Sequence, residues 1–126
     1  SREESDYLPH NYNHNCVVYT GTHDNNTILG WLDEMAPHDR DFALRYMNNY
    51  HTPHHEMPWD FIRLAMGSVA DLAVTPIQEF LCLGGEARIN RPSTLGTNWK
   101  WRLTPGQITE QVIGRMYEMT KLYGRL

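Results

Sequence analysis

The sequence has little of what marks several specialised classes of protein. Its 126 residues include only two cysteines, Cys16 and Cys82, which do not make a disulfide framework. We interpret both as buried free thiols, and this favours a cytoplasmic protein. No stretch approaches the roughly 18 consecutive apolar residues of a membrane span, which excludes a membrane-embedded protein. Acidic residues outnumber basic ones by 15 to 11, so nucleic acid is not expected as a partner bound through bulk charge.

Motifs of several enzyme classes are also missing. The sequence has no phosphate-cradling glycine loop, no nucleophilic-serine elbow and no dinucleotide fingerprint, and we expect no cofactor. It begins with Ser1 rather than Met and has no signal peptide. It is nevertheless rich in His, Trp and Tyr, with 7, 4 and 7 residues, which a minimal structural domain does not need. We therefore expect the chain to be a piece of a longer protein.

The order of apolar residues predicts an α/β fold that is mostly helical and has two short parallel strands. Residues 16–20 and 71–75 are short apolar runs typical of strands buried on both faces. Helical spacing of apolar residues predicts helices in five segments: 28–35, 38–50, 58–67, 76–83 and 108–123. Strands separated by helices pair in parallel. Two strands do not make a stable parallel sheet alone, which is a second indication that the chain is incomplete.

Capping patterns mark three of these helix starts. Asp24, Asn25 or Asn26 could cap the first helix. Residues 75–78 and 104–107 both read Thr-Pro-x-Gln, the form of a capping box with Pro at the first helical position.

The most informative segment is the polar run at residues 22–26, directly after the first predicted strand. In parallel α/β folds, ligands bind at the carboxyl ends of strands, and in barrels catalytic residues lie there. His23 could donate a hydrogen bond to a hydroxyl, and Asp24 could hold a carboxylate near developing positive charge. The alternative is a polar helix cap with no chemical role.

A second polar segment, residues 84–102, follows the second predicted strand and should lie on the same face as His23 and Asp24. Its Asn, Arg and Trp residues suit a sugar site, because amide and guanidinium groups bind hydroxyls and an indole packs on a pyranose ring. The alternative is a structural loop in which Trp99 and Trp101 are buried core anchors.

The histidine-rich residues 51–56 have the composition of a metal site without its spacing. Pro53 prevents a helix from aligning these histidines on one face. We expect a polar surface loop and no metal, and we interpret His10 and His14 in the same way. The residues do not assign a role to the cluster from His51 to His55.

Two long motifs in the same order resemble one family. They are Val-Tyr-Thr-Gly-Thr-His-Asp-Asn-Asn-Thr at 18–27 and Gly-Glu-Ala-Arg-Ile-Asn-Arg-Pro at 85–92, which continues to Asn-Trp-Lys-Trp-Arg-Leu at 98–103. Together they resemble the 4-alpha-glucanotransferases, also called amylomaltases or disproportionating enzymes, of glycoside hydrolase family seventy-seven. Residues 7–15 resemble the family's lead-in to the first motif, so the resemblance covers essentially the whole chain.

The resemblance implies a (β/α)8 TIM barrel, of which residues 1–126 would form the C-terminal portion without being a complete independent domain. It also implies a retaining transfer of α-1,4-glucan segments to another glucan or to glucose. The expected partners are maltooligosaccharides, starch or glycogen, together with the rest of the barrel upstream. The nucleophilic Asp and the acid/base Glu of the family lie on earlier strands, so we expect the isolated chain to be inactive.

Four residues match functional positions of the family. Asp24 matches its third carboxylate, whose implied role is to hold the 2- and 3-hydroxyls of a distorted sugar and stabilise the oxocarbenium-like transition state. His23 matches the neighbouring histidine that binds the same sugar. Arg88 and Asn90 lie in the second motif, residues 85–103, which matches a loop late in the family's sequence. This late loop borders the cleft near the acceptor side.

Two other functions are alternatives to this enzyme. One is a non-catalytic carbohydrate-binding module that uses Trp99 and Trp101 as a platform, and the other is a purely structural helical fragment. Asp24 at a strand end favours the enzyme, and a binding module would more often be an all-β sandwich.

Overall fold

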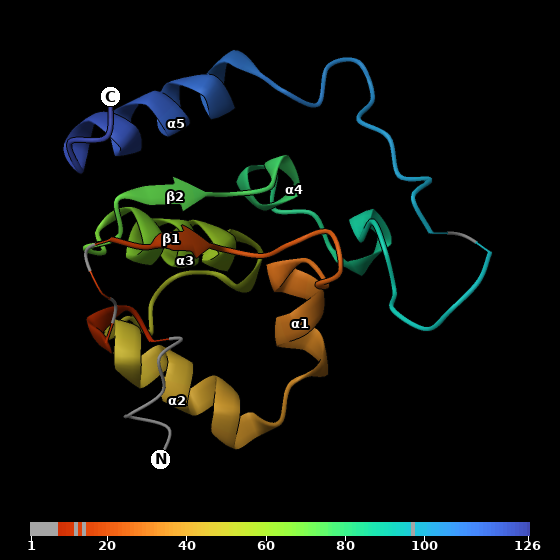
Figure 1. Cartoon of the computed structure of the whole chain (residues 1–126), viewed down its shortest axis with the longest axis horizontal. Helices are drawn as coiled ribbons and strands as arrows, with labels where there is room; N and C mark the ends of the chain where they lie inside the picture. The colour runs from red at the N-terminus through yellow and green to blue at the C-terminus, as the bar shows by residue number, and fades with distance from the viewer. Residues whose placement is uncertain (1–7, 12, 14, 97) are drawn as a thin grey trace.

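Short helices and two strands make up the computed structural model, which describes residues 8–11, 13, 15–96 and 98–126. The elements in chain order are η2 (Pro9–Asn11), β1 (Val17–Tyr19), α1 (Ile28–Glu34), α2 (Pro37–Met47), η3 (His54–Glu56), α3 (Met57–Met66), β2 (Leu72–Val74), α4 (Ile77–Phe80), η4 (Gly85–Ala87) and α5 (Glu110–Leu122). Figure 1 shows the two strands side by side, with the long loop between η4 and α5 extending away from them. The predicted order of strands and helices is confirmed.

The two strands pair in parallel, as predicted. Val18 lies opposite Ala73, and one pair on each side of it completes the register. Helices α1 to α3 form the crossover between the strands, which is the connection that parallel pairing requires. The carboxyl ends of β1 and β2 therefore point the same way, and the polar segments that follow them begin close together.

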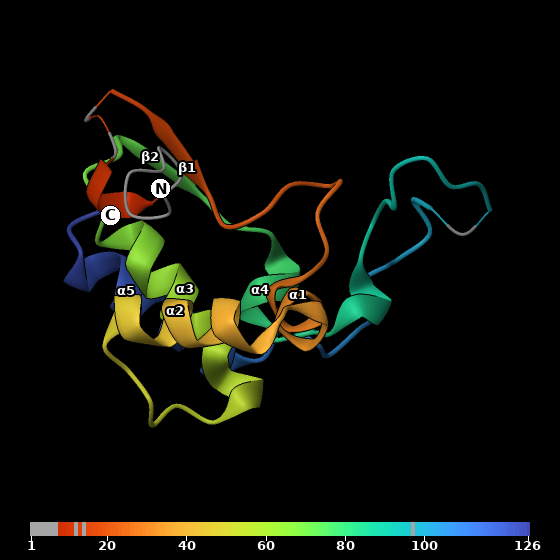
Figure 2. The ribbon, with the colours of Figure 1, turned by 90° about the horizontal axis from the view of Figure 1, so that it is seen from below.

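The sheet is covered on one face only. All five α-helices lie on the same side of it (Figures 1 and 2). On that side Val18 is 5% exposed and packs with Ala65 and Ala70. On the opposite side Tyr19 is 55% and Leu72 54% exposed, because alternate residues of a strand point to opposite faces. The prediction that both strands are buried on both faces is thus wrong for this chain.

Helix α3 forms the centre of the core. At its start Met57 packs with the buried face of α1, and further along Ile62 packs with Phe80 of α4 and Met119 of α5. Its apolar residues recur at the 3.6-residue period, so one helix contacts neighbours on two sides. Pro58 lies in its first turn and Gly67 follows its end, as predicted.

The first helix is capped by Thr27, the residue after the three predicted cap candidates. The Thr27 hydroxyl accepts a hydrogen bond from the Gly30 amide at 3.2 Å. The prediction that Asp24, Asn25 or Asn26 caps α1 is therefore wrong. Because Thr27 takes this role, the three preceding side chains are available for other contacts.

The two predicted capping boxes do not cap helices either, although α4 does begin within the first of them, at Ile77. Pro76 is the N-cap residue of α4, and the helix start has no side-chain cap. At 104–107 the Gln107 side chain does accept from the Thr104 amide at 2.7 Å, but Gly106 has φ +85°, which an α-helix does not accommodate. Helix α5 begins later, where Thr109 accepts from the Val112 amide.

Two helices end earlier than predicted because a non-glycine residue adopts the left-handed conformation. Asn48 has φ +50° and ends α2 at Met47, and Cys82 has φ +53° after α4 ends at Phe80. At the second position the Leu83 amide donates to the Gln78 carbonyl at 3.0 Å, the bond pattern of a Schellman-type helix end.

Both cysteines are free and half-buried rather than fully buried. Burial raises the pKa of the Cys82 thiol to about 11. Within the part of the chain that the structure describes, every helix is too short or too polar to cross a lipid bilayer.

The histidine-rich segment contains the short helix η3 and lies at the surface. The Arg40 guanidinium contacts the His54 Nδ1 atom at 3.2 Å, and the His54 Nε2 atom lies 2.9 Å from the Asp33 carboxylate. His54 thus links α1 to α2 through η3. His14, from the same set of predictions, lies outside the described residues.

Candidate functional site

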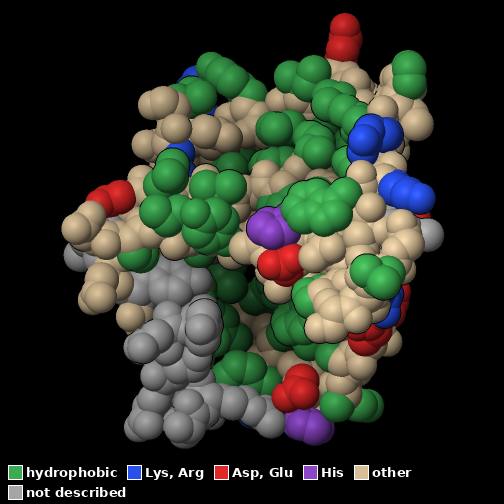
Figure 3. All heavy atoms as spheres, turned by 45° about the vertical axis from the view of Figure 1, so that its right-hand side comes forward, with side chains coloured by type: hydrophobic (Ala, Val, Ile, Leu, Met, Phe, Trp, Pro, Cys, Tyr) green, Lys and Arg blue, Asp and Glu red, His purple; other side chains and the backbone are tan. Residues whose placement is uncertain are grey.

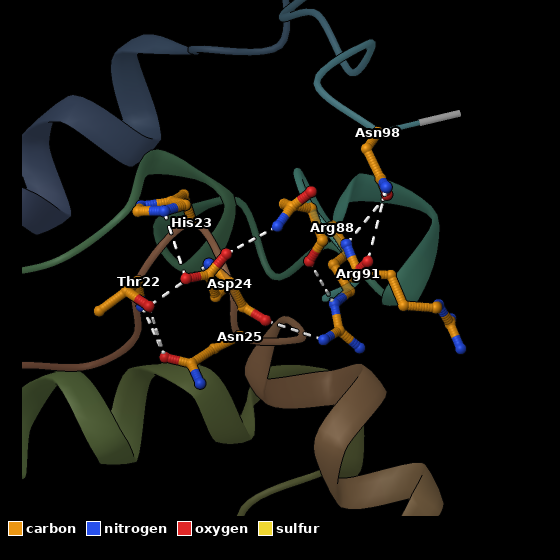
Figure 4. A network of polar contacts seen from close by, with 8 residues as sticks. Thr22, His23, Asp24, Asn25, Arg88, Arg91 and Asn98 are labelled. Atoms are coloured by element: carbon orange, nitrogen blue, oxygen red, sulfur yellow. Dashed lines mark hydrogen bonds and ion pairs between the residues drawn. The ribbon is translucent and has the colours of Figure 1, made fainter. Parts of the chain in front are cut away.

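The polar segment after β1 folds into a tight turn held by its own side chains. The Asn25 Oδ1 atom accepts from the Thr22 amide at 2.9 Å and from the Thr22 hydroxyl at 3.0 Å. In return the Asn25 amide donates to the Thr22 carbonyl at 3.1 Å. This turn brings the side chains of His23 and Asp24 to the same side, facing the loop that follows β2 (Figure 4).

Asn26 closes the turn against α1 in a space that two glycines leave open. Its Oδ1 atom accepts from the Thr27 amide at 2.8 Å. A Cβ atom on Gly30 would lie 2.3 Å from that oxygen, and one on Gly85 would lie 3.4 Å from it. Gly30 and Gly85 therefore allow η4, which leads into the late loop, to pack against the start of α1.

The Asp24 carboxylate has a polar contact on each of its two oxygens. Its Oδ1 atom accepts from the Asn90 side-chain amide at 2.7 Å, and its Oδ2 atom lies 3.3 Å from His23 Nε2. The Asp24 side chain is 49% exposed, so the carboxylate remains accessible to a ligand. The contacts fix its orientation, and each oxygen keeps further acceptor capacity.

Backbone contacts join the same two segments. The Asn90 amide donates to the His23 carbonyl at 3.1 Å. The Arg88 guanidinium donates to the Asp24 carbonyl at 2.8 Å and to the Asn90 carbonyl at 2.9 Å. The structure thus brings together all four residues that the sequence analysis selected, Asp24, His23, Arg88 and Asn90. Their roles toward a substrate stay predictions.

The late loop also places an aromatic ring at the site. The Trp99 ring lies against the His23 ring, with centroids 5.0 Å apart, and its amide donates to the Ile89 carbonyl. Asn98 holds the loop closed by accepting from the Arg91 amide at 2.9 Å (Figure 4). Trp99 is 55% exposed, so the interpretation of this residue as a buried core anchor is wrong.

A cavity of about 460 Å³ opens between the carboxyl ends of the two strands. It is lined by residues of the turn after β1, of the β2–α4 connection and of the late loop, among them Tyr19, His23, Asn25, Gln78, Glu79 and Arg88. Figure 3 shows a hollow in the surface, lined by hydrophobic side chains, beneath a histidine and an acidic side chain. Polar groups at the rim of an apolar hollow are typical of a small-molecule site.

Two residues in the cavity wall were missed by the sequence analysis. Gln78 and Glu79 are 5% and 3% exposed, although both types usually lie at the surface. Burial raises the pKa of the Glu79 carboxyl to about 7, and a hydrogen bond from the Ile28 amide partly opposes this shift. The signal in the sequence was a polar pair between Ile77 and Phe80, inside a short apolar run.

The arrangement suits the binding of a polyhydroxylated ligand. A carboxylate and an imidazole 3.3 Å apart provide hydrogen-bond acceptors and a donor for adjacent hydroxyls. The indole of Trp99 adds a flat apolar surface for the face of a sugar ring.

The comparisons with known proteins agree with one another. A family model described as 4-alpha-glucanotransferase matches residues 1–109. A 4-alpha-glucanotransferase of Clostridium butyricum is 43% identical over 94% of this chain and 24% of its own length. The enzyme of the same name from Thermus thermophilus is 44% identical over 98% of this chain and 26% of its own length.

A solved structure shows the same likeness in three dimensions. The structure of amylomaltase from Streptococcus agalactiae in complex with acarbose superimposes with a TM-score of 0.88 at 33% identity. The match covers 96% of this chain and 24% of that one. The chain thus spans about a quarter of the length of the relatives that it matches.

Proposed function

The chain belongs to the 4-alpha-glucanotransferase family, and from this premise we propose that it forms the C-terminal part of an enzyme that transfers α-1,4-glucan segments. The observation that carries the proposal is the Asp24 carboxylate, held by Asn90 at 2.7 Å at the carboxyl end of β1. In this proposal Asp24 binds the sugar at the point of cleavage. The nucleophile and the acid/base come from the part of the protein upstream.

We place the segment in a (β/α)8 barrel as its last two strands, without an independent domain of its own. The open face of the sheet supports this placement. Val17 and Tyr19 of β1 and Leu72 and Val74 of β2 are 38–55% exposed there, as the inward-pointing residues of barrel strands would be without their neighbours. Neighbouring strands would cover these apolar side chains and pair with the free edges of the sheet.

The proposed reaction is a double displacement with retention at the anomeric carbon. A carboxylate nucleophile attacks that carbon while a carboxylic acid protonates the leaving glycosidic oxygen. The 4-hydroxyl oxygen of the acceptor then attacks the anomeric carbon, which breaks the glycosyl–enzyme bond and releases the nucleophile as a carboxylate, and the same acid/base residue takes the hydroxyl proton. Asp24 accepts hydrogen bonds from the sugar's 2- and 3-hydroxyls, and its negative charge stabilises the oxocarbenium-like transition state in both steps.

The other three site residues complete the sugar contacts in this proposal. His23 binds the same sugar as Asp24, from the side on which Trp99 covers its ring. Asn90 and Arg88 border the acceptor side, and both also hold the Asp24 segment in place.

The proposed partners are maltooligosaccharides, starch or glycogen, together with the upstream part of the barrel. The proposed compartment is the cytoplasm, on the support of the two free cysteines. The sequence motif, the parallel strand ends and the shape of the site all favour a glucan over a charged macromolecule as substrate.

The test is Asp24→Asn in the full-length protein that contains this segment, with maltotriose as substrate. We expect turnover to fall at least about a hundredfold, because a neutral amide does not stabilise developing positive charge. Circular dichroism and thermal unfolding should match the wild type. The matched control is Asp71→Asn, an exposed aspartate directly before β2 at the opposite end of the sheet, which should leave turnover unchanged.

Measurements on the isolated segment, added to the turnover of full-length Asp24→Asn, separate the enzyme from a binding module. We expect the isolated 126-residue segment to have no transferase activity. Retention of the isolated segment on starch, lost in Trp99→Ala, together with normal turnover of full-length Asp24→Asn, would favour the binding module and contradict the proposal.

A further inference from the structure

Helix α4 carries two adjacent polar side chains, Gln78 and Glu79, that are almost completely buried. They are 5% and 3% exposed and are flanked by Ile77 and Phe80. Burying a polar group costs free energy unless it has a hydrogen-bond partner. Both side chains find partners outside α4, in the two segments that carry the candidate site.

Glu79 holds the segment that follows β1. Its Oε2 and Oε1 atoms accept from the Ile28 amide at 2.9 and 3.3 Å. Ile28 is the first residue of α1, and amides in the first turn of a helix have no acceptor within the helix. Thr27, which joins the turn 22–26 to Ile28, is also buried. The contact of Glu79 with Ile28 therefore fixes the C-terminal end of this turn against the core.

Gln78 holds the segment that follows β2. Its side-chain amide donates to the Ala87 carbonyl at 3.3 Å, and Ala87 is fully buried. The next residue is Arg88, which reaches the Asp24 carbonyl, and Asn90 follows two positions later. The contact of Gln78 therefore fixes the start of the late loop immediately before its two site residues.

We infer that Gln78 and Glu79 are positioning residues for Asp24, because one turn of α4 anchors both of the segments that meet at the Asn90–Asp24 hydrogen bond. They act through the backbone of the segments that they hold and need no contact with the sugar. The inference rests on the proposed function, which gives Asp24 its role in the transition state. A displacement of about 1 Å at a catalytic group can cost a hundredfold in rate.

The test uses Glu79→Met and Gln78→Met in the full-length protein. Both substitutions keep a long side chain in the core and remove the buried acceptor or donor. We expect kcat on maltotriose to fall about tenfold or more, while KM changes less than about threefold, since the loss concerns the transition state. Glu79→Gln keeps an oxygen that can accept from the Ile28 amide, and we expect it to restore kcat to within about threefold of the wild type.

Two controls separate positioning from a general loss of stability. Thr109→Ala removes the cap of α5, far from the site, and should lower the melting temperature without changing kcat. In an Asn90→Ala background the hydrogen bond to Asp24 is already absent. Adding Gln78→Met there should lower kcat by less than about twofold, because coupled residues are not additive.

The outcomes distinguish this inference from the proposed function. If Gln78→Met and Glu79→Met keep wild-type kcat while Asp24→Asn is inactive, the positioning role is wrong and the proposed function stands. Normal turnover of Asp24→Asn would instead overturn the proposed function. If Glu79→Met does not fold, Gln78→Met decides, because it removes a single hydrogen bond.

Discussion

Two polar clusters in this molecule have hydrogen bonds of similar length and very different burial. The inner cluster consists of Gln78, Glu79, Ile28 and Ala87, and the outer cluster of Asp33, Arg40 and His54. In the inner cluster the Glu79 carboxylate lies 2.9 Å from the Ile28 amide, and Glu79 is 3% exposed. In the outer cluster His54 lies 2.9 Å from Asp33, but these side chains are 41% and 65% exposed.

Bond length alone therefore does not indicate how much a polar contact contributes to the stability of the fold. Water competes with the outer cluster and screens its charges, so exposed pairs of this kind contribute about 0–1 kcal/mol. In the inner cluster a missing partner leaves a polar group buried without a hydrogen bond, which costs about 1–3 kcal/mol. The inner cluster also joins both segments of the candidate site, whereas the outer one ties together surface helices.

The largest effect is expected for the pH dependence of stability through Glu79. Its pKa of about 7 in the folded protein lies above the ordinary value of 4.5, so the folded protein binds the proton more tightly than the unfolded chain. The stabilisation from Glu79 is fully present below about pH 4.5 and is lost as the pH rises to about 7. We expect the free energy of unfolding of wild type, relative to Glu79→Gln, to fall by about 3 kcal/mol across this range.

Urea denaturation of the full-length protein at pH 4 to 8 measures this effect. Gln78→Met is the matched control, because it changes the neighbouring buried side chain without removing a titratable group. Its stability should differ from that of wild type by the same amount at every pH. A constant difference between wild type and Glu79→Gln over the same range would show that the burial of Glu79 has no such consequence.

The next effect concerns Asn90. Asn90→Ala removes the donor that lies 2.7 Å from the Asp24 carboxylate and leaves the backbone contacts of the loop in place. We expect kcat on maltotriose to fall about tenfold to thirtyfold, because the carboxylate loses its fixed orientation. Asn49→Ala is the matched control. Its side-chain amide donates to the Thr52 hydroxyl at 2.7 Å and accepts from the His51 amide at 3.1 Å, far along the chain from the site. Equal turnover of the two variants would contradict the role of Asn90.

A smaller effect is expected for the close packing at Gly30. A methyl group there would meet the Asn26 side chain at 2.3 Å, so Gly30→Ala should lower the free energy of unfolding by about 1–2 kcal/mol. Gly114→Ala is the matched control, because no atom lies within 4 Å of a Cβ atom at that position of α5. There the change should be neutral or stabilising by up to about 1 kcal/mol. Thermal unfolding of the two variants compares them directly.

The sequence predicted the order of elements because apolar periodicity is a local signal. It predicted the ends of elements less well, since these depend on contacts that periodicity does not contain. Helix α4 ends at Phe80 because Cys82 adopts a left-handed conformation, and nothing in its residue type indicates that. The strands were expected to be buried on both faces because an apolar run does not reveal which part of the protein covers it.

The residues of the candidate site were predicted more completely from the sequence than the ends of the elements around them. Asp24 and Asn90 came from motifs that resemble a family, and the structure places their side chains in contact. Gln78 and Glu79 could not be found in this way, because a Gln-Glu pair normally indicates an exposed helix face. Only the packing of α4 against α1 and η4 shows that the pair is buried and holds both site segments.

The smallest effect is expected for the outer cluster. Because the Arg40 guanidinium faces Nδ1 of His54, that nitrogen must accept, and Nε2 then donates to Asp33. His54→Ala removes both contacts, but water can replace them on the exposed Asp33 and on the half-buried Arg40. We expect the free energy of unfolding to fall by less than about 1 kcal/mol and kcat to stay unchanged. The neighbouring His55→Ala is the control for the loss of an exposed ring. If His54→Ala alone lost about 3 kcal/mol of stability or lost turnover, burial would not explain which of the two clusters stabilises the protein.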